Sequence, residues 1–127
     1  MIQRLTHIYY KETDDRGRGV FTARSINAGD VIEICPIVVI PKAQIEILDQ
    51  TVLYDYYFLW ENNNAAIALG YGSLYNHSYS PNAEYIMDFV DSSLIIQAIK
   101  DINAHEEITF NYNGDPVDDE DLWFKTL

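Results

Sequence analysis

Residues 70–82 read GYGSLYNHSYSPN, an Asn-His pair between a small-residue opening and a Ser-x-x-Pro-Asn turn. Pro81 fixes its own φ and restricts Ser80 to extended geometry, so we expect a sharp bend just after His77. Asn76 and His77 both carry donor and acceptor groups, which lets a constrained pair hold the polar edge of a small molecule. Taken alone, the pair is more simply explained as a surface turn whose side chains bind nearby backbone. The other motifs of the chain decide between these two interpretations.

The composition indicates one folded domain of ordinary size, because the chain has 127 residues of which 48% are hydrophobic. Acidic residues number 20 against 8 lysines and arginines, which gives a net charge of −12. This balance argues against nucleic acid or an anionic membrane as the partner, since phosphate binding needs clustered positive charge. It permits a basic, lysine-containing protein or peptide as partner, although acidity also serves solubility alone.

Cys35 is the single cysteine, so neither an internal disulfide framework nor a Cys/His zinc cluster can form. The three histidines, His7, His77 and His105, lie far apart in the sequence, and we expect no metal site. The N-terminus lacks the long apolar run of a signal peptide, and the apolar segment 31–40 is too short to cross a bilayer. These features predict a soluble protein of the cytoplasm, or of a host nucleus if the source is viral.

Short β-branched and aromatic runs separated by turn residues predict an irregular, mainly β domain over residues 1–127. Apolar residues recur at three- and four-residue steps after residue 42, which predicts a short helix or irregular turn before a strand that starts near Asp55. Residues 107–112 alternate as in a half-buried strand. The strands expected elsewhere are 8–10, 20–23, 31–40 as one or two strands broken near Pro36, 65–69, 83–89 and 93–99.

Two further segments carry residues suited to a binding site. The loop at 16–19 reads RGRG between two expected strands, and its glycines would let the backbone approach a ligand closely. Alone it is more simply an ordinary β-turn, and it fits neither the dinucleotide-binding nor the P-loop pattern. Glu106 and Glu107 are adjacent in an expected strand, so they point to opposite faces and make a poor acid–base pair. Tyr112 and Tyr56 could each orient an amine while their rings exclude water, although a tyrosine taken alone is more simply explained as packing in a core or at its rim.

In this order, the three motifs resemble those of the SET-domain protein-lysine methyltransferases. RGRGVF at 16–21 resembles the family's opening Gly-x-Gly motif, LYNHSYSPN at 74–82 its Asn-His-Ser-x-x-Pro-Asn motif, and EEITFNY at 106–112 its Glu-Glu-Ile-Thr-Phe-x-Tyr motif. The second motif is highly specific and the first is loose. The resemblance covers nearly the whole chain and is greatest to the minimal SET proteins of viruses and bacteria.

The resemblance implies a SET-domain, or β-clip, fold of small curled sheets in which the C-terminal strand threads beneath a loop as a pseudoknot. It also implies S-adenosylmethionine as cofactor and the side-chain amine of lysine in a basic protein, such as a histone or chromatin protein, as methyl acceptor. Tyr112 would be the active-site tyrosine, and Tyr56 a second wall of the lysine channel. The cofactor-binding residues implied are Arg16, Gly17, Arg18, Gly19, Tyr75, Asn76 and His77.

The chain departs from many relatives because it lacks the cysteine-rich zinc segments that flank larger SET domains. We therefore expect residues 115–127 to fold over the site, with Trp123 and Phe124 as an aromatic cover for the cofactor. A homodimer is compatible with the minimal viral type. Two alternatives stay open at this point. The chain could be a SET-fold module that binds a basic peptide or partner without turnover, or an all-β interaction domain with chance motifs.

Overall fold

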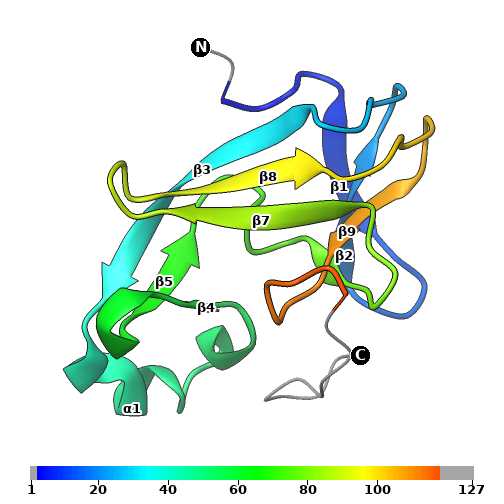
Figure 1. Ribbon diagram of the computed structural model, residues 1–127. Helices are drawn as coiled ribbons and strands as arrows, with labels where there is room; N and C mark the ends of the chain where they lie inside the picture. Colours follow the sequence, from blue (N-terminus) through cyan, green and yellow to red (C-terminus); the bar gives the residue numbers. More distant parts are fainter. Residues whose placement is uncertain (1–2, 118–127) are drawn as a thin grey trace.

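The computed structural model describes residues 3–117, which form two β-sheets and a group of short helical turns within residues 42–63 (Figure 1). One sheet has four strands in the order β1-β2-β9-β6, and the other has five in the order β4-β5-β3-β8-β7. The strands are β1 Ile8–Glu12, β2 Arg18–Thr22, β3 Val31–Ile40, β4 Phe58–Leu59, β5 Ala65–Ala68, β6 Asn76–His77, β7 Ala83–Asp88, β8 Ser93–Ala98 and β9 Glu107–Phe110. The helical elements are η1 Lys42–Gln44, α1 Ile45–Leu48, η2 Val52–Asp55 and η3 Glu61–Asn63. The mainly β fold predicted from the sequence is thus confirmed.

Strand β3 is continuous and changes its partner halfway along. Residues 31–36 pair with β8, whereas residues 37–40 pair with β5. Pro36 lies at the change, and its carbonyl accepts a hydrogen bond from the N–H of Leu69 at 2.9 Å. The missing N–H of a proline costs little at this position, because one run of pairing ends there and the next begins. The expectation of a break near Pro36 is therefore wrong.

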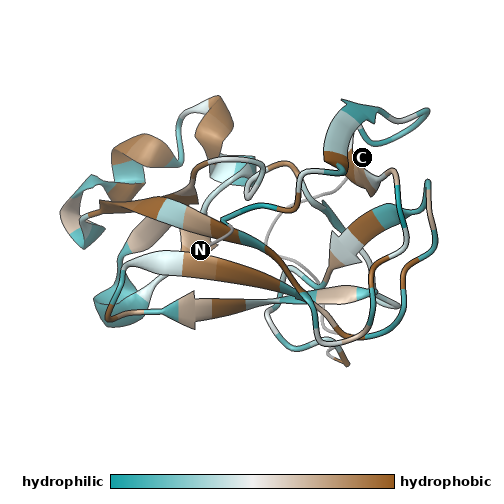
Figure 2. Cartoon of the chain, turned by 90° about the horizontal axis from the view of Figure 1, so that it is seen from above, coloured by the Kyte–Doolittle hydropathy of each residue, from teal (hydrophilic) through white to brown (hydrophobic). Residues whose placement is uncertain are grey.

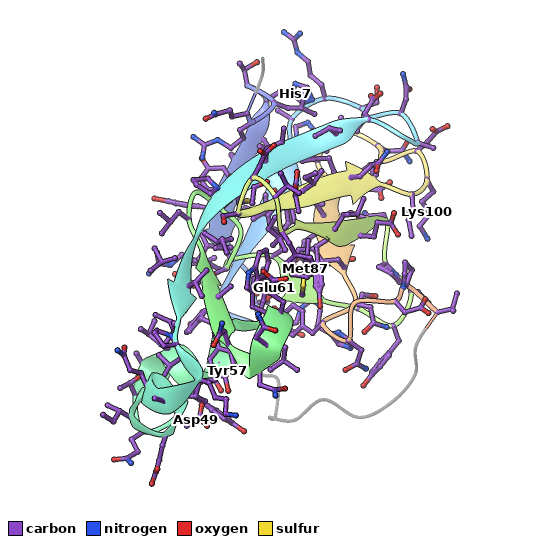
Figure 3. The ribbon with its side chains drawn as sticks, turned by 60° about the vertical axis from the view of Figure 1, so that its left-hand side comes forward. His7, Asp49, Tyr57, Glu61, Met87 and Lys100 are labelled. Atoms are coloured by element: carbon purple, nitrogen blue, oxygen red, sulfur yellow. The ribbon has the colours of Figure 1, made fainter. Side chains whose placement is uncertain are left out.

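The segment 42–60 is more helical than its aromatic sequence predicts. A 3₁₀ turn, η2, occupies residues up to Asp55, and the strand that follows, β4, has only two residues. Thr51 stabilises this turn, since its hydroxyl accepts a hydrogen bond from the N–H of Leu53 at 3.2 Å. The Tyr57 hydroxyl donates to Asp49 at 2.9 Å, and the two side chains lie together at the helical end of the molecule (Figure 3). The predicted strand from about Asp55 is wrong because these local bonds favour turns.

The predicted hairpin of residues 83–99 is confirmed. Strands β7 and β8 pair antiparallel from Ala83 opposite Ala98 to Asp88 opposite Ser93. The carboxylate of Asp88 accepts from the N–H groups of the next turn residues, Val90 and Asp91, at 3.1 Å each. An Asx turn of this kind explains why the chain reverses here.

Strand β9 lies in the middle of the four-stranded sheet, antiparallel to β2 and parallel to β6. Its residues Ile108, Thr109 and Phe110 are all buried, so the half-buried strand expected from the alternation is wrong. Burial on both faces follows from insertion between two strands that come from distant parts of the chain. This insertion of the C-terminal strand beside the Asn-His strand is the arrangement that the resemblance implies for the pseudoknot.

The core lies between the sheets, where strand residues and the loop at 70–82 meet. Figure 2 shows long apolar stretches along the strands and mostly hydrophilic connecting turns. The largest fully buried side chains are Tyr75, Phe110, Ile26, Ile32, Leu94, Ile96, Ile102 and Ile108. Two of these, Tyr75 and Phe110, pack with ring centroids 5.3 Å apart. The Asn-His strand and β9 are therefore anchored by the same core.

Asn82 attaches β9 to the end of the loop at 70–82. Its Nδ2 donates to the carbonyl of Glu107 at 2.8 Å, and its Oδ1 accepts from the N–H of Thr109 at 2.9 Å. The asparagine is 8% exposed, so water cannot replace these bonds readily. The Pro-Asn end of the motif thus holds the strand that leads to Tyr112.

Replacing Asn82 with alanine is expected to lower the free energy of unfolding by about 2–3 kcal/mol, because the buried N–H of Thr109 loses its acceptor. Urea unfolding measures this loss as a lower midpoint at an unchanged m-value. Asn103→Ala is the control: this asparagine is exposed, and its loss is expected to cost under about 0.5 kcal/mol. An equally small change for Asn82→Ala would mean that strand pairing alone places β9.

Candidate active site

A cavity of about 360 Å³ lies where the glycine loop, the Asn-His strand and the end of β9 meet. The three sequence motifs, which are far apart in the chain, all contribute to its wall. The site residues predicted from the sequence that line it are Arg16, Gly17, Arg18, Tyr56, Asn76 and Tyr112. Apolar surface comes from residues outside the motifs, namely Leu53, Ile67 and Ala68, and from Leu74 at the start of the second motif. The cavity therefore combines polar groups with apolar surface.

The glycine loop requires glycine at two positions for different reasons. Gly17 has a φ of +69°, a backbone conformation that L side chains rarely adopt. Gly19 has ordinary dihedral angles, but a Cβ at this position would lie 2.5 Å from Oε2 of Glu107 and 2.9 Å from Nδ2 of Asn76. Gly19 thus allows the loop to pack directly against a polar cluster beside the cavity.

Asn76 is held by two hydrogen bonds from its amide nitrogen. Nδ2 donates to the carbonyl of Arg18 at 3.2 Å and to Oε2 of Glu107 at 2.7 Å. The other carboxylate oxygen of Glu107, Oε1, is paired with the guanidinium of Arg16. These contacts tie the glycine loop, the Asn-His strand and β9 together through one carboxylate.

His77 supports the site from behind. Its Nδ1 accepts a hydrogen bond from the N–H of Tyr112 at 3.0 Å, and its backbone carbonyl accepts from Arg16 at 3.3 Å. Burial, assisted by the charge of Arg16, lowers the pKa of His77 below its ordinary value of 6.5. The ring packs edge-on against Tyr79 with centroids 4.3 Å apart. The neutral imidazole is thus part of the structure that positions the backbone of Tyr112.

The pKa of His77 predicts a loss of stability in mild acid. Because its pKa is lower in the folded state, the unfolded chain binds the proton first as the pH falls below about 6.5. Stability is therefore complete above that pH and declines as the pH falls through the lower folded-state pKa. His77→Asn, which keeps an acceptor for Tyr112, is expected to flatten this decline in urea midpoints between about pH 7.5 and 5.5.

The matched control for this measurement is His105→Asn. His105 is exposed and has a φ of +71°, which asparagine tolerates better than most residues. Its removal is expected to leave the wild-type slope of stability against pH in place. A wild-type slope retained in His77→Asn would contradict the assignment of the decline to His77.

Tyr112 lines both the larger cavity and a second, smaller one. The hydroxyl donates to the carbonyl of Tyr75 at 2.5 Å, and burial raises the pKa of Tyr112 well above its ordinary value of 10. A narrow cavity of about 20 Å³ adjoins it, lined by aromatic side chains that include Tyr56, Tyr57 and Phe58. Tyr56 is 43% exposed and lines both this cavity and the larger one. The two tyrosines singled out from the sequence thus converge.

A third cavity, of about 350 Å³, lies beside Tyr112 and is lined by Leu59, Tyr85, Met87, Asn113 and Gly114 as well. The Tyr85 hydroxyl donates to the carbonyl of Tyr112 at 3.0 Å, and burial raises the pKa of Tyr85 to about 12. Tyr112 therefore contributes to all three cavities, with the glycine loop on one side and the β7 side chains on another.

Among the predicted cofactor residues that the structure describes, Gly19, Tyr75 and His77 do not line the larger cavity. Tyr75 is 1% exposed and its hydroxyl donates to the buried carboxylate of Glu33 at 2.8 Å, so its side chain belongs to the core. Trp123 and Phe124 lie outside the described residues. His77 and Gly19 adjoin the site through the backbone and through packing, as described above.

The sequence did not identify Glu107 as part of the site. As one of two adjacent acids in a strand, it was excluded from acid–base chemistry, and its pairing with Arg16 and Asn76 depends on three-dimensional packing. One signal in the sequence could have indicated Glu107. Adjacent residues of a strand point to opposite faces, so if Glu106 faces solvent, Glu107 faces the protein. Among residues 3–117, no group of three His, Cys, Asp or Glu side chains is arranged to hold a metal ion. No helix in that part of the chain is long and apolar enough to span a membrane.

Comparison with known proteins places these features in context. The family model described as SET domain matches residues 17–113. The chain is 34% identical over 116 residues to the Schizosaccharomyces pombe histone-lysine N-methyltransferase specific for H3 lysine-37, with 91% of this chain and 75% of the relative covered. A crystal structure of a Plasmodium falciparum protein described as a candidate histone methyltransferase is 33% identical, with a TM-score of 0.64 over 83% of this chain and 96% of that one.

A second solved structure, from work on the product specificity of histone lysine methyltransferases, has a TM-score of 0.71. It is 22% identical, and the match covers 88% of this chain and 52% of that chain. At this identity the likeness supports the fold alone. The larger TM-score nevertheless confirms that the two curled sheets and their connections are those of the same architecture.

Proposed function

Because this chain belongs to the SET-domain family and is a protein-lysine methyltransferase, we propose that its cavity of about 360 Å³ binds S-adenosylmethionine. The observation that carries the proposal is the convergence of the three motifs on one cavity, with Tyr112 in its wall. Enzymes of this family use S-adenosylmethionine, which supplies an electrophilic methyl group that an amine takes with cleavage of the carbon–sulfur bond. The residues present suit this cofactor in shape and polarity.

Several groups of the cavity would hold such a ligand. Leu53 and Leu74 offer apolar surface for the adenine ring, while the backbone of the glycine loop can approach closely because Gly17 has no side chain. Asn76 uses both amide hydrogens within the protein, so its carbonyl oxygen is the group it can offer to a donor on the ligand.

Methyl transfer needs alignment and a neutral amine more than it needs a base. A free lysine has a pKa of about 10.4, and an aromatic, partly dry channel lowers it by disfavouring the ammonium form. Tyr56 and Tyr112 would form the walls of that channel. The hydroxyl of Tyr112 donates a hydrogen bond to the backbone carbonyl of Tyr75, and the hydroxyl oxygen would accept a hydrogen bond from the amine and orient its nitrogen. The lysine proton leaves to solvent.

The substrate we propose is a basic protein, with a histone as the first choice. Two relatives carry histone methyltransferase in their descriptions, and one is named for lysine 37 of H3. The net charge of −12 supports this class, because acidic surface attracts lysine-rich chains and speeds their encounter. Residues 1–127 would act as a single domain.

Calorimetry with S-adenosylmethionine, followed by transfer of a labelled methyl group to histone and to non-histone lysine-rich peptides, tests the proposal. Binding with transfer to a histone peptide is the expected result. Binding without transfer to any peptide would favour a module that only holds a basic partner, and no binding would overturn the proposal. The same titration of a chain ending at Asn113 tests the expectation that residues 115–127 contribute to cofactor binding, which their removal is expected to weaken.

A further inference from the structure

The carboxylate of Glu107 contacts both Arg16 and Asn76, two residues that line the cavity, but the sequence predicts no role for it. We propose that Glu107 is a positioning residue, whose carboxylate sets the direction of the Asn76 amide and neutralises Arg16, so that the cavity accepts a cationic ligand. This inference rests on the proposed function, since the cationic ligand is S-adenosylmethionine. It differs from that function because it concerns a group that does not line the cavity.

The carboxylate is built into the protein rather than offered to solvent. Its side chain is 14% exposed, and β9 holds its backbone opposite Phe21 of β2. The carbonyl of Glu107 is held in addition by the Asn82 amide at 2.8 Å. Gly19 leaves the space that the carboxylate fills, since a Cβ there would lie 2.5 Å from Oε2. The position of the Glu107 carboxylate is thus fixed by its strand, by the Asn82 amide on its backbone, and by the packing of Gly19.

One consequence concerns the polarity of Asn76. An asparagine amide can be turned over with little change of shape, which exchanges a carbonyl acceptor for an NH₂ donor. Oε2 of Glu107 accepts at 2.7 Å and can bind only the NH₂ end. Together with the carbonyl of Arg18, which accepts from the same nitrogen at 3.2 Å, the carboxylate excludes the reversed amide and leaves the oxygen of Asn76 for the cavity. An acceptor in this place suits the ammonium group of the ligand, whereas a donor would oppose it.

The other consequence concerns charge. Arg16 lines the cavity, and an unpaired guanidinium there would disfavour a ligand whose sulfonium and ammonium groups outweigh its one carboxylate. Pairing with Glu107 compensates the positive charge within the protein. Asp15, the second carboxylate near Arg16 at 3.7 Å, is 81% exposed and is screened by solvent. Glu107 is therefore the partner that controls the charge of Arg16 at the site.

The test compares S-adenosylmethionine with S-adenosylhomocysteine, which has a neutral thioether in place of the sulfonium. Glu107→Gln is expected to weaken binding of both ligands, because the amide of Asn76 loses its shorter, charged acceptor and is held in direction by the carbonyl of Arg18 alone. It is expected to weaken S-adenosylmethionine further, by at least about fivefold more than S-adenosylhomocysteine, because Arg16 is uncompensated. Adding Arg16→Gln to Glu107→Gln is expected to remove this extra penalty. Calorimetry of wild type, both single variants and the double variant with both ligands measures these effects.

Glu106→Gln is the matched control, since it removes the same charge one residue away. Glu106 is exposed, and its carboxylate accepts from the N–H of Asn103 at 3.2 Å, away from the cavity. The affinities of the Glu106→Gln variant for both ligands are expected to stay within about twofold of wild type. Methyl transfer gives a second readout: Glu107→Gln is expected to raise KM for the cofactor with kcat at saturation changed less than about threefold.

Side-chain amide signals in a nitrogen–proton correlation spectrum provide a readout that needs no cofactor. The NH₂ group of Asn76 is expected to exchange slowly in the wild type and faster in Glu107→Gln at an unchanged unfolding midpoint. If wild type binds S-adenosylmethionine while Glu107→Gln binds both ligands as tightly, the positioning role is overturned and the proposed function stands. If wild type itself does not bind S-adenosylmethionine, the proposed function is overturned, and the positioning role that rests on it is overturned with it.

Discussion

Tyr112→Phe is expected to lower kcat by about 100-fold or more while cofactor affinity changes less than about threefold. The substitution deletes one oxygen and keeps the ring, so the cavity walls persist. What is lost is the acceptor that orients the amine and the hydrogen bond of 2.5 Å to the carbonyl of Tyr75. Since transfer in line with the carbon–sulfur bond depends on alignment, the loss falls on the chemical step rather than on binding.

Initial rates at saturating cofactor and peptide measure this effect, and calorimetry on the same samples measures cofactor binding. Tyr9→Phe is the matched control. It deletes the same atom from a tyrosine of β1 that stacks on Phe21, with centroids 5.9 Å apart, and lines none of the three cavities. Its rate is expected to equal that of wild type. A Tyr112→Phe rate within about threefold of wild type would show that the hydroxyl does not orient the amine.

The raised pKa of Tyr112 distinguishes an orienting role from that of a base. Burial raises the pKa of this phenol well above 10, so its ionisation contributes nothing to the rate between about pH 7 and 9. The rate in that range is expected to follow deprotonation of the lysine and to rise with pH. The Tyr112→Phe variant is expected to show the same upward slope at a lower level, because the titrating group belongs to the substrate.

The candidate site could be predicted from the sequence because its three motifs combine residue types that occur together in few other contexts. An Asn-His pair before a Ser-x-x-Pro-Asn turn and a tyrosine after a Glu-Glu strand are specific combinations. The structure brings Asn76 and Tyr112 to one cavity with the glycine loop. The hairpin of 83–99 could also be predicted, since alternation and turn residues are local properties.

Other features could not be read from the sequence, because they depend on contacts between distant segments. Both faces of β9 are buried, including the polar residue Thr109, because the strand is inserted between β2 and β6. No local sequence pattern encodes this insertion. Glu33 lies in an apolar run, where a charged residue would normally face solvent. It is instead 2% exposed and accepts from the Tyr75 hydroxyl at 2.8 Å and from the N–H of Tyr71 at 3.0 Å. Donors 38 and 42 residues away satisfy its carboxylate oxygens, and the guanidinium of Arg4 at 3.7 Å compensates its charge.

The segment 42–60 shows the opposite case, in which local chemistry overrides propensity. Its aromatic residues favour a strand, but the Thr51 hydroxyl and the bond between Tyr57 and Asp49 stabilise turns. As a result Tyr56 lies in a turn beside the cavity rather than in a sheet. A side chain in this position is 43% exposed and can reach both the solvent and the site. The turn at 52–56 therefore explains both why the strand predicted from about Asp55 does not form and why Tyr56 lines the cavity.

Gly19→Ala is expected to weaken S-adenosylmethionine binding by about 10- to 100-fold. The new methyl group would lie 2.5 Å from Oε2 of Glu107 and 2.9 Å from Nδ2 of Asn76, so both groups must move apart. Losing one hydrogen bond to a charged group costs about 1.5–3 kcal/mol, and each 1.4 kcal/mol is about a tenfold change in affinity. The backbone φ at Gly19 lies outside the left-handed region, so the effect reports the contact and not strain.

Gly29→Ala separates a loss of affinity from a loss of stability. Gly29 has a φ of +91°, and a methyl group added there would meet nothing within 4 Å, in a turn that does not line the cavity. Alanine there is expected to cost about 1 kcal/mol of unfolding free energy through backbone strain, with cofactor affinity unchanged. Gly19→Ala is expected to show the reverse, a large loss of affinity measured by calorimetry with a smaller loss of stability. Equal affinity in Gly19→Ala and wild type would mean that the polar cluster behind the glycine loop does not shape the cofactor site.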